Sequence, residues 1–354
     1  MTNSLMRVDV SSVVILGQLY KQGGVTTCIE EITRVFEINK NRVITLVTFT
    51  SPSKLSSELC ELIDKNNNVK IIHLPSDVTS LISIVRNSAG TIVISNTYYS
   101  IFLLLFKSSR KFHILHGWGM LVNGLPRFVS GNLGNMVGSW FSNKTIANSY
   151  HTALVGRVFG IEASTIIPLG IPNSRLNALK VSQCPNVSRD IDLLYVGRFI
   201  KVKKIDVMLE SFKSLSKLTP GISLHVVGGK LSDLDFEIDE SLASKIHFHG
   251  FVDNIELSNL YRRSKIFISL HPDEPFGLTF VEALAHGTPI IASKGSGIAP
   301  FVNAEMGSLV DINEHSVCQA VTNAFSKKWD YEYIEDMALQ TFSWEKIKDY
   351  IEAS

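Results

Sequence analysis

Two glutamates stand on either side of a predicted helix start, directly after a predicted strand that ends at Leu270. Pro275 suits the first turn of a helix and Gly287 its C-terminal cap, so we predict a helix that begins beside Glu274. The first N–H groups of a helix have no partner inside it, and together with the helix dipole they favour a phosphate. The predicted donors are the amides of Phe276, Gly277 and Leu278.

The second glutamate, Glu282, is one helical turn beyond Leu278 and therefore shares its face. Because a carboxylate can accept from two hydroxyls, Glu282 could bind a ribose next to the phosphate. Glu274, just outside the helix, could accept from sugar hydroxyls on the other side of a diphosphate. The alternative is that both glutamates only favour a helix N-terminus and a solvated helix face.

The stretch from Glu274 to Pro289 resembles a known motif. It matches the E-x7-E signature of glycosyltransferase family 4, retaining enzymes of the GT-B fold, in the Glu pair and the Pro-Phe-Gly-Leu core. It also matches in the continuation Glu-Ala-Leu-Ala-x-Gly-Thr-Pro. The match weakens after Ser293, where the chain lacks the Glu that family members commonly carry. The resemblance implies a nucleotide-diphosphate sugar as the donor substrate, with Glu274 as a candidate catalytic residue.

A second segment, from Tyr195 to Asp206, resembles the Gly-Arg-…-Lys element of the same family. The resemblance implies that Arg198 and Lys203 bind the diphosphate and neutralise the leaving group, as a bidentate fork and a point charge. The family usually has Gly where this chain has Lys204. This departure leaves open whether Lys203 or Lys204 is the functional lysine.

Two features of the N-terminal half also resemble the family. Gly23 and Gly24 follow the first predicted strand and open a helix, like the family's glycine pair near the diphosphate and the acceptor. His116 stands at a later strand end, where the family often has a histidine close to the transferred sugar. His116 is therefore the second candidate catalytic residue, although a histidine at a strand end can also be a structural hydrogen-bonding group.

The elements that must position these residues form a regular alternation of short Val- and Ile-rich runs with longer amphipathic segments. This pattern is typical of βαβ units on parallel sheets. The strands predicted in the first half are Val13–Gly17, Val43–Thr48, Val69–Leu74, Thr91–Ser95, Phe112–Leu115, Thr145–Ala147 and Thr165–Pro168. Those in the second half are Asp192–Gly197, Ser223–Val227, Lys245–His249, Lys265–Leu270, Pro289–Ala292 and Ser308–Val310.

The alternation breaks between Gly170 and Arg189, where Pro, Asn and Ser interrupt it, so we predict two domains. The expected fold class is α/β, GT-B, with two doubly wound Rossmann-like domains that face a central cleft. The predicted ranges are 1–170 for an acceptor-side domain, 171–189 for a linker and 190–335 for the nucleotide-sugar-binding domain. The resemblance implies that a C-terminal helix within 336–354 crosses back to the first domain.

Composition excludes several classes of function. Lys and Arg number 34 against 33 Asp and Glu, so the chain has no overall attraction to nucleic acid. The four cysteines lie far apart, which indicates neither a zinc site nor a disulfide framework and fits a reducing compartment. The run Ile101–Phe106 is too short to span a membrane. With Lys107, Arg110 and Lys111 it could be a buried helix with a charged end or a membrane-surface patch.

The expected activity is transfer of a sugar, with retention of configuration, to a hydroxyl of a glycan or lipid-linked glycan acceptor. On the resemblance, the expected setting is the biosynthesis of O-antigen, capsule or lipopolysaccharide, in the cytoplasm, with the inner face of the plasma membrane as the alternative location. Neither a metal nor another cofactor is expected. One alternative is an NAD(P)-type Rossmann oxidoreductase, although no early strand is followed by G-x-G-x-x-G. The other is a catalytically silent GT-B partner subunit.

Overall fold

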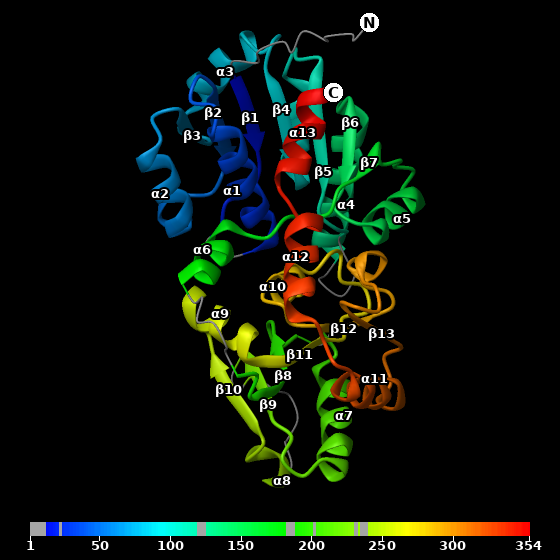
Figure 1. The fold of residues 1–354 in the computed structure, drawn as a ribbon. Helices are drawn as coiled ribbons and strands as arrows, with labels where there is room; N and C mark the ends of the chain where they lie inside the picture. Colours follow the sequence, from blue (N-terminus) through cyan, green and yellow to red (C-terminus); the bar gives the residue numbers. More distant parts are fainter. Residues whose placement is uncertain are drawn as a thin grey trace, which may run out of the picture. The chain divides into compact units, whose positions relative to one another are not determined.

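A computed structural model of the protein describes residues 12–20, 23–118, 125–181, 188–200, 203–229, 233 and 240–354. The chain divides into two compact units, each built on one parallel sheet (Figure 1). Unit 1 comprises Met1–Leu169 and Ser343–Ser354, and unit 2 comprises Gly170–Phe342. Each unit is therefore described by itself.

The sheet of unit 1 has seven parallel strands in the order β3-β2-β1-β4-β5-β6-β7. Its strands are β1 (Ser12–Leu16), β2 (Val43–Thr48), β3 (Val69–His73), β4 (Ile92–Asn96), β5 (Arg110–Leu115), β6 (Lys144–Ala147) and β7 (Thr165–Ile166). All five residues of β4 are buried, and so are the last four of β1. Because successive side chains of a strand point to opposite faces, both faces of the sheet centre are covered.

The helices of unit 1 connect these strands in chain order. They are α1 (Gly24–Glu37), α2 (Ser57–Lys65), α3 (Val78–Arg86), α4 (Leu125–Phe141) and α5 (Tyr150–Val158), with the 3₁₀ helices η1 (Pro52–Lys54) and η2 (Thr97–Leu104). The C-terminal helix α13 (Glu345–Ala353) completes the unit. No helix of the described residues is both long and apolar enough to cross a membrane.

The sheet of unit 2 has six parallel strands in the order β10-β9-β8-β11-β12-β13. They are β8 (Ile191–Val196), β9 (Leu224–Val227), β10 (Ile246–Gly250), β11 (Ser264–Ser269), β12 (Ile290–Ser293) and β13 (Gly307–Val310). The helices are α6 (Asn173–Val181), α7 (Ile205–Leu218), α8 (Glu240–Ala243), α9 (Asn254–Arg263), α10 (Leu278–Ala285), α11 (Glu314–Ser326) and α12 (Tyr331–Thr341), with η6 (Ala299–Phe301). A buried cluster centred on Phe212, Leu224 and Ile268 forms its core.

The strand predictions are confirmed, each within two residues of the observed ends, and so is the α/β class with two parallel sheets. The segment 171–189, which we predicted to be an irregular linker, is partly helical. Part of it forms α6, which packs on α9 within unit 2. Its sequence shows little apolar periodicity, and specific contacts hold it instead. Ala178 is buried, and the Arg175 guanidinium donates to Asn254 Oδ1.

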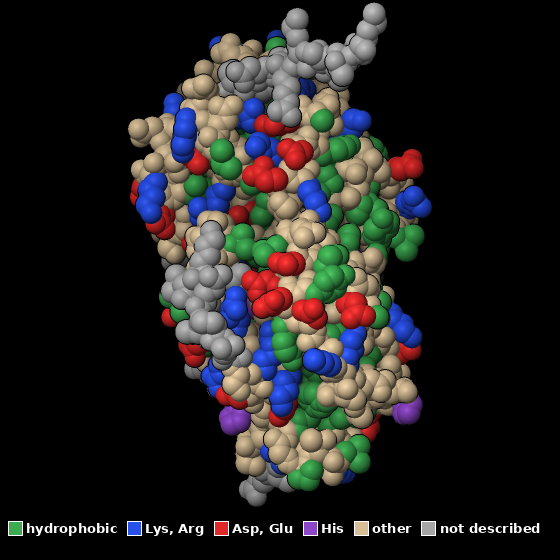
Figure 2. Space-filling view, in the orientation of Figure 1, with side chains coloured by type: hydrophobic (Ala, Val, Ile, Leu, Met, Phe, Trp, Pro, Cys, Tyr) green, Lys and Arg blue, Asp and Glu red, His purple; other side chains and the backbone are tan. Residues whose placement is uncertain are grey.

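Charge is mixed over the face drawn in Figure 2, where Lys and Arg side chains are interspersed with acidic ones on both units. Asp and Glu gather over α12, which carries Glu332, Glu335 and Asp336. This mixture agrees with a formal net charge of +1. Binding of an anion therefore has to depend on local groups.

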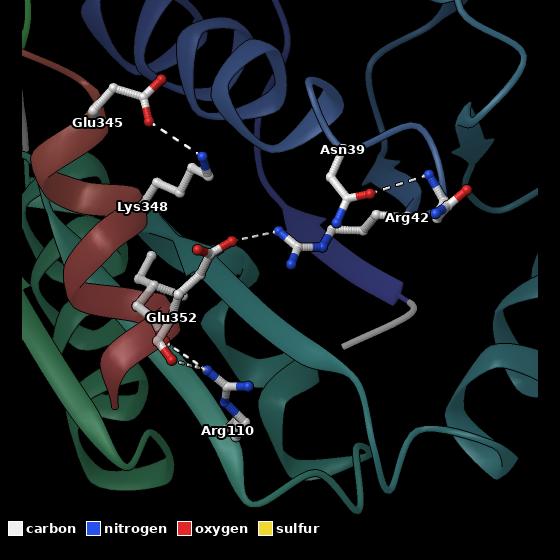
Figure 3. A network of polar contacts seen from close by, with 8 residues as sticks. Asn39, Arg42, Arg110, Glu345, Lys348 and Glu352 are labelled. Atoms are coloured by element: carbon white, nitrogen blue, oxygen red, sulfur yellow. Dashed lines mark hydrogen bonds and ion pairs between the residues drawn. The ribbon is translucent and has the colours of Figure 1, made fainter. Parts of the chain in front are cut away.

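Helix α13 docks on unit 1 through a network of polar contacts (Figure 3). Arg42 Nη1 lies 2.6 Å from Glu352 Oε1. Arg110 Nη2 donates to the backbone oxygens of Ile351 and Glu352 at 2.8 and 3.0 Å. A cation at the C-terminal end of a helix compensates the helix dipole and its unpaired carbonyl groups. Arg110, which we predicted with Lys107 and Lys111 to be either the charged end of a buried helix or part of a membrane-surface patch, therefore caps a helix.

Candidate functional site

The order of strands in unit 2 reverses between β8 and β11. In open parallel sheets, ligands bind outside the carboxyl ends of the strands at such a reversal. Arg198 follows the end of β8, and Glu274 follows the end of β11. The topology thus brings the two predicted donor-binding segments to one place in the sheet.

A contact between side chains joins these two segments. Lys203 Nζ forms an ion pair with Glu274 Oε2, although the residues are 71 positions apart. Both side chains are mostly shielded, with 21% and 17% of their surfaces exposed. Solvent therefore screens this pair less than a surface pair. The Arg198 side chain is exposed, and its backbone oxygen accepts from the Tyr195 hydroxyl at 3.3 Å.

The neighbouring lysine, Lys204, has a different place. It is the N-cap of α7 and adopts a left-handed backbone conformation with φ of 53°. Glycine adopts this conformation at no steric cost, which explains why glycine suits this position. Lys203, and not Lys204, makes the contact with Glu274.

We expect Lys204→Gly to raise the free energy of unfolding by about 1 kcal/mol, because it relieves the left-handed strain of a residue with a Cβ. Urea denaturation measures the change. Lys213→Gly in the interior of α7 is the matched control, and it should lower stability by about 1 kcal/mol. A loss of stability in Lys204→Gly would contradict the strain argument.

The helix beside Glu274 starts later than the sequence indicated. We predicted Pro275 in its first turn, which is wrong, because α10 begins at Leu278 with Gly277 as its N-cap at φ 92°. A left-handed residue cannot continue a helix, so Gly277 sets the start. A Cβ at Gly277 would lie 2.5 Å from Phe280 Cδ2 and 3.1 Å from Glu274 Cγ. At the other end, Gly287 follows the cap at φ 69°, as predicted.

The side chain and the backbone of Phe276 have separate environments. Its ring is 2% exposed and packs edge-on against Phe301 and Phe342, so it belongs to the core. The backbone of Glu274 is fixed by the N–H of Gly297, which donates to its carbonyl at 2.7 Å. Within this turn, the groups predicted to bind an anion are therefore the backbone amides.

Glu282 is buried, with 6% of its surface exposed, which excludes the alternative of a solvated helix face. Tyr261 donates its hydroxyl to Glu282 Oε2 at 3.1 Å, and Arg175 Nε lies 3.3 Å from Glu282 Oε1. Burial, and then the charge of Glu282, raise the pKa of Tyr261, so its hydroxyl remains a donor. Sequence reasoning missed Tyr261 and Arg175. Neither carries a motif, and Arg175 lies in the segment assigned to the linker.

His286, one helical turn after Glu282, is also buried. Its Nδ1 donates to the backbone oxygen of Glu282 at 2.6 Å, so its Nε2 accepts from the hydroxyl of Ser258 at 2.6 Å. Burial lowers the pKa of His286 to about 4. The folded protein therefore holds this ring neutral at pH 7.

This pKa predicts how stability depends on pH. Between its folded value of about 4 and an unfolded value of about 6.5, the unfolded chain binds more protons at His286 than the folded one. The contribution of His286 to stability is therefore full above about pH 6.5 and is lost as the pH falls toward about 4. Urea unfolding at several pH values should show a shallower fall in His286→Gln. An identical pH slope in both proteins would contradict this assignment.

In unit 1 the strand order reverses between β1 and β4, and His116 follows β5 near that point. His116 Nε2 lies 2.6 Å from Asn96 Oδ1, and Asn96 Nδ2 donates to the Leu16 carbonyl at 3.2 Å. The amide orientation thus places the proton of His116 on Nε2 and leaves Nδ1 as an acceptor. Burial lowers the pKa of His116, which keeps the ring neutral.

The glycine pair lies at the start of α1, after the end of β1. Gly23 is the N-cap with φ 145°, and a Cβ at Gly23 or Gly24 would meet no atom within 4 Å. Open space and a backbone that favours glycine agree with a close approach of a ligand. Within the described ranges, no group of three or more His, Cys, Asp or Glu residues is placed to hold a metal ion. The roles predicted for the site residues of both units stay predictions.

The second half of the chain is similar to a known protein family. Residues 182–337 match the family model described as glycosyl transferases group 1. Mannosylfructose-phosphate synthase of Agrobacterium fabrum is 31% identical over 117 residues, which are 30% of this chain and 26% of the synthase. The first curated relatives are matched over about a quarter to a half of their own length.

Solved structures agree with the fold over nearly the whole chain. Anabaena HepE, in complex with UDP and glucose, has a TM-score of 0.71 at 16% identity and covers 97% of this chain and 100% of its own. WaaG, a glycosyltransferase involved in lipopolysaccharide biosynthesis, has a TM-score of 0.63 at 15% identity with the same coverage. The predicted GT-B class of two Rossmann-like domains is confirmed. Residues 182–337 are thus similar to the glycosyl transferases group 1 family.

Proposed function

We propose that the protein is a glycosyltransferase that moves a sugar from a nucleotide-diphosphate sugar to a hydroxyl of a glycan or lipid-linked glycan. The observation that carries this proposal is the Lys203–Glu274 pair at the strand reversal of unit 2, next to the amides before α10. A cation and free amides bind a diphosphate, and a carboxylate binds sugar hydroxyls. The family of residues 182–337 supports this class of reaction.

The site residues that follow β8 and β11 have proposed roles in the departure of the diphosphate. Lys203 and Arg198 neutralise the charge that develops on the leaving group, together with the amides of Gly277 and Leu278. An ammonium has three donors, so Lys203 can keep its contact with Glu274 while it binds a phosphate oxygen. Glu274 then accepts from hydroxyls of the donor sugar.

Glu282 is the proposed partner of the ribose. Arg175 and Tyr261 fix the orientation of its carboxylate, and a carboxylate has about four lone-pair sites, so acceptor capacity remains for two hydroxyls. Retention of configuration and independence from a metal are part of the proposal on the basis of the family resemblance. For Gly23, Gly24 and His116 we propose contacts with the diphosphate, the acceptor and the transferred sugar.

The donor and the setting are proposed at the level of class. HepE is solved with UDP and glucose and with UDP-glucose, which supports a UDP-sugar as the first donor to test. WaaG takes part in lipopolysaccharide biosynthesis, which supports a bacterial cell-surface glycan as the acceptor. We propose a cytoplasmic location with peripheral contact to the inner membrane face. Exposed hydrophobic side chains of η2 support that contact, namely Ile101 and Leu104.

The proposal is tested by incubating the purified protein with UDP-, GDP- and ADP-sugars and measuring release of the nucleotide diphosphate and transfer. Thermal shift with the same nucleotides and with NAD(P) separates the two enzyme classes, because a bound ligand stabilises the folded state. We expect a shift with at least one nucleotide sugar. A shift with NAD(P) alone would support the oxidoreductase, and donor binding without turnover would support the silent subunit.

We expect Glu282→Ala to lower kcat/KM for the donor by about 100-fold or more, since it removes two hydrogen bonds to a charged group worth about 1.5–3 kcal/mol each. Initial rates at varied donor concentration measure the change. Glu256→Ala, an exposed glutamate on α9, is the matched control and should leave kcat/KM unchanged. Equal activity of Glu282→Ala and the parent protein would reject the ribose assignment.

A further inference from the structure

Unit 1 contains an apolar cavity of about 410 Å³ that the proposed reaction does not use. Its volume lies in the range of ligand pockets, roughly 300–1,000 Å³. Helix α3 and the segment of η2 supply most of its lining, together with residues that follow β2 and β3. The lining side chains include Phe49, Leu74, Leu81, Ile82, Phe102 and Leu105.

The chemistry of the lining restricts what the cavity can bind. Arg86 is the one charged residue among those that line it, and the others are hydrophobic. Several lining side chains also reach solvent: Val78 and Ile82 are 42% and 44% exposed, and Leu105 is 50% exposed. The cavity therefore has an apolar interior and an apolar rim. Its interior suits a hydrocarbon chain, because a polar ligand would find few hydrogen-bonding partners there.

Two cations belong to the segments that form this lining: Arg86 is a lining residue, and Lys107 is two positions after the lining residue Leu105. Arg86 lies in the last turn of α3. The backbone N–H of Lys107 donates to Ser88 Oγ at 2.9 Å, which holds Lys107 beside the residues that follow Arg86. In the part of the chain that the structure describes, neither the Arg86 guanidinium nor the Lys107 ammonium has a recorded ion pair or hydrogen bond. The dipole of helix α3 favours a cation such as Arg86 in the last turn. The dipole does not explain why this cation borders an apolar cavity.

We propose that this cavity binds the hydrocarbon chain of a lipid whose phosphate lies against Arg86 and Lys107. The identity of that lipid rests on the proposed function, under which it is the phosphate-linked lipid that carries the acceptor glycan. Each methylene group that enters the cavity strengthens binding by about fourfold. Affinity for alkyl phosphates therefore rises with chain length until the cavity is filled.

Calorimetric titration with dodecyl phosphate, below the concentration at which it forms micelles, tests the binding. Dodecyltrimethylammonium, with the same chain and the opposite charge, is the matched ligand, and inorganic phosphate tests the head alone. The parent protein binds dodecyl phosphate more tightly than either. Ile82→Asp places a charge on the rim at a half-exposed position and weakens binding by about tenfold or more.

Arg86→Gln tests the phosphate contact. It weakens dodecyl phosphate binding by about tenfold, the loss expected for a hydrogen bond to a charged group, and leaves dodecyltrimethylammonium unaffected or improved. Leu218→Asp, an exposed position at the end of α7 in unit 2, controls for the added charge and leaves binding unchanged. Unchanged thermal unfolding of all three variants shows that they fold.

Several outcomes would overturn the proposal. They are equal binding of dodecyl phosphate by the parent protein and Ile82→Asp, equal affinity for both dodecyl ligands, and binding to anionic vesicles without binding of dodecyl phosphate. The titration needs no turnover, so it decides about the cavity even if no nucleotide sugar is a substrate. If both proposals hold, Ile82→Asp raises KM for a lipid-linked acceptor and leaves transfer to a short water-soluble glycan unchanged.

Discussion

Replacing Lys203 by alanine is expected to lower kcat for sugar transfer by about 100- to 1,000-fold, the usual cost of removing one preorganised donor to a developing negative charge. The leaving diphosphate gains charge as its bond to the sugar breaks, and Lys203 is the cation that the fold holds beside Glu274. The donor KM should change less than kcat, because the contact strengthens toward the transition state. Single-turnover rates at saturating donor measure the effect.

Lys204→Ala is the control, since Lys204 has the same side chain at the next position and makes no contact with Glu274. It should retain kcat within about threefold, as expected for a charge removed away from the reacting groups. Circular dichroism and thermal unfolding check that Lys203→Ala folds, because the variant leaves Glu274 without its cation. If the two variants lose activity equally, general electrostatic attraction explains the effect and the specific assignment fails.

The largest expected effect on stability is at the C-terminal helix. Ile347 on α13 is fully buried, and its replacement by alanine should lower the free energy of unfolding by about 2–5 kcal/mol, the cost of a cavity in a core. Urea denaturation gives the change, and hydrogen exchange locates it, with faster exchange expected in α13 and in α1, against which α13 packs.

Asp349→Ala tests the same helix on its exposed side and should stay within about 0.5 kcal/mol of the parent. The comparison separates packing from helix propensity, because both variants place alanine in α13. Slow exchange in α1 that persists in Ile347→Ala would mean that α13 contributes little to unit 1.

The sequence predicted the parallel sheets closely, because buried parallel strands are short, nearly continuous apolar runs rich in Val and Ile. It also predicted which segments follow β8 and β11, and the topology then brought Lys203 and Glu274 together. What it could not predict depends on backbone angles and distant contacts. The left-handed Gly277 moved the helix start past Pro275, and a proline in a possible first turn does not reveal this.

The sequence also did not reveal which side chains contact Glu282. Arg175 lies in a helix whose sequence has little apolar periodicity, and its partners are more than 75 positions away in the chain. No local pattern reports an ion pair of that kind. The same holds for Arg110, which the sequence assigned to a helix end or a surface patch and whose guanidinium caps the distant helix α13. Long-range polar contacts thus decided the roles that local sequence left open.

The discontinuity of unit 1 has a consequence for synthesis. A ribosome makes Met1–Leu169 before unit 2 and Ser343–Ser354 after it. Domains generally fold as they emerge, N-terminal first. Here unit 2 has its complete sequence before unit 1 does, and the partners of Arg42 and Arg110 are still missing when the first sheet forms. Unit 1 is therefore completed only after unit 2, because its helix α13 follows the whole of unit 2 in the chain.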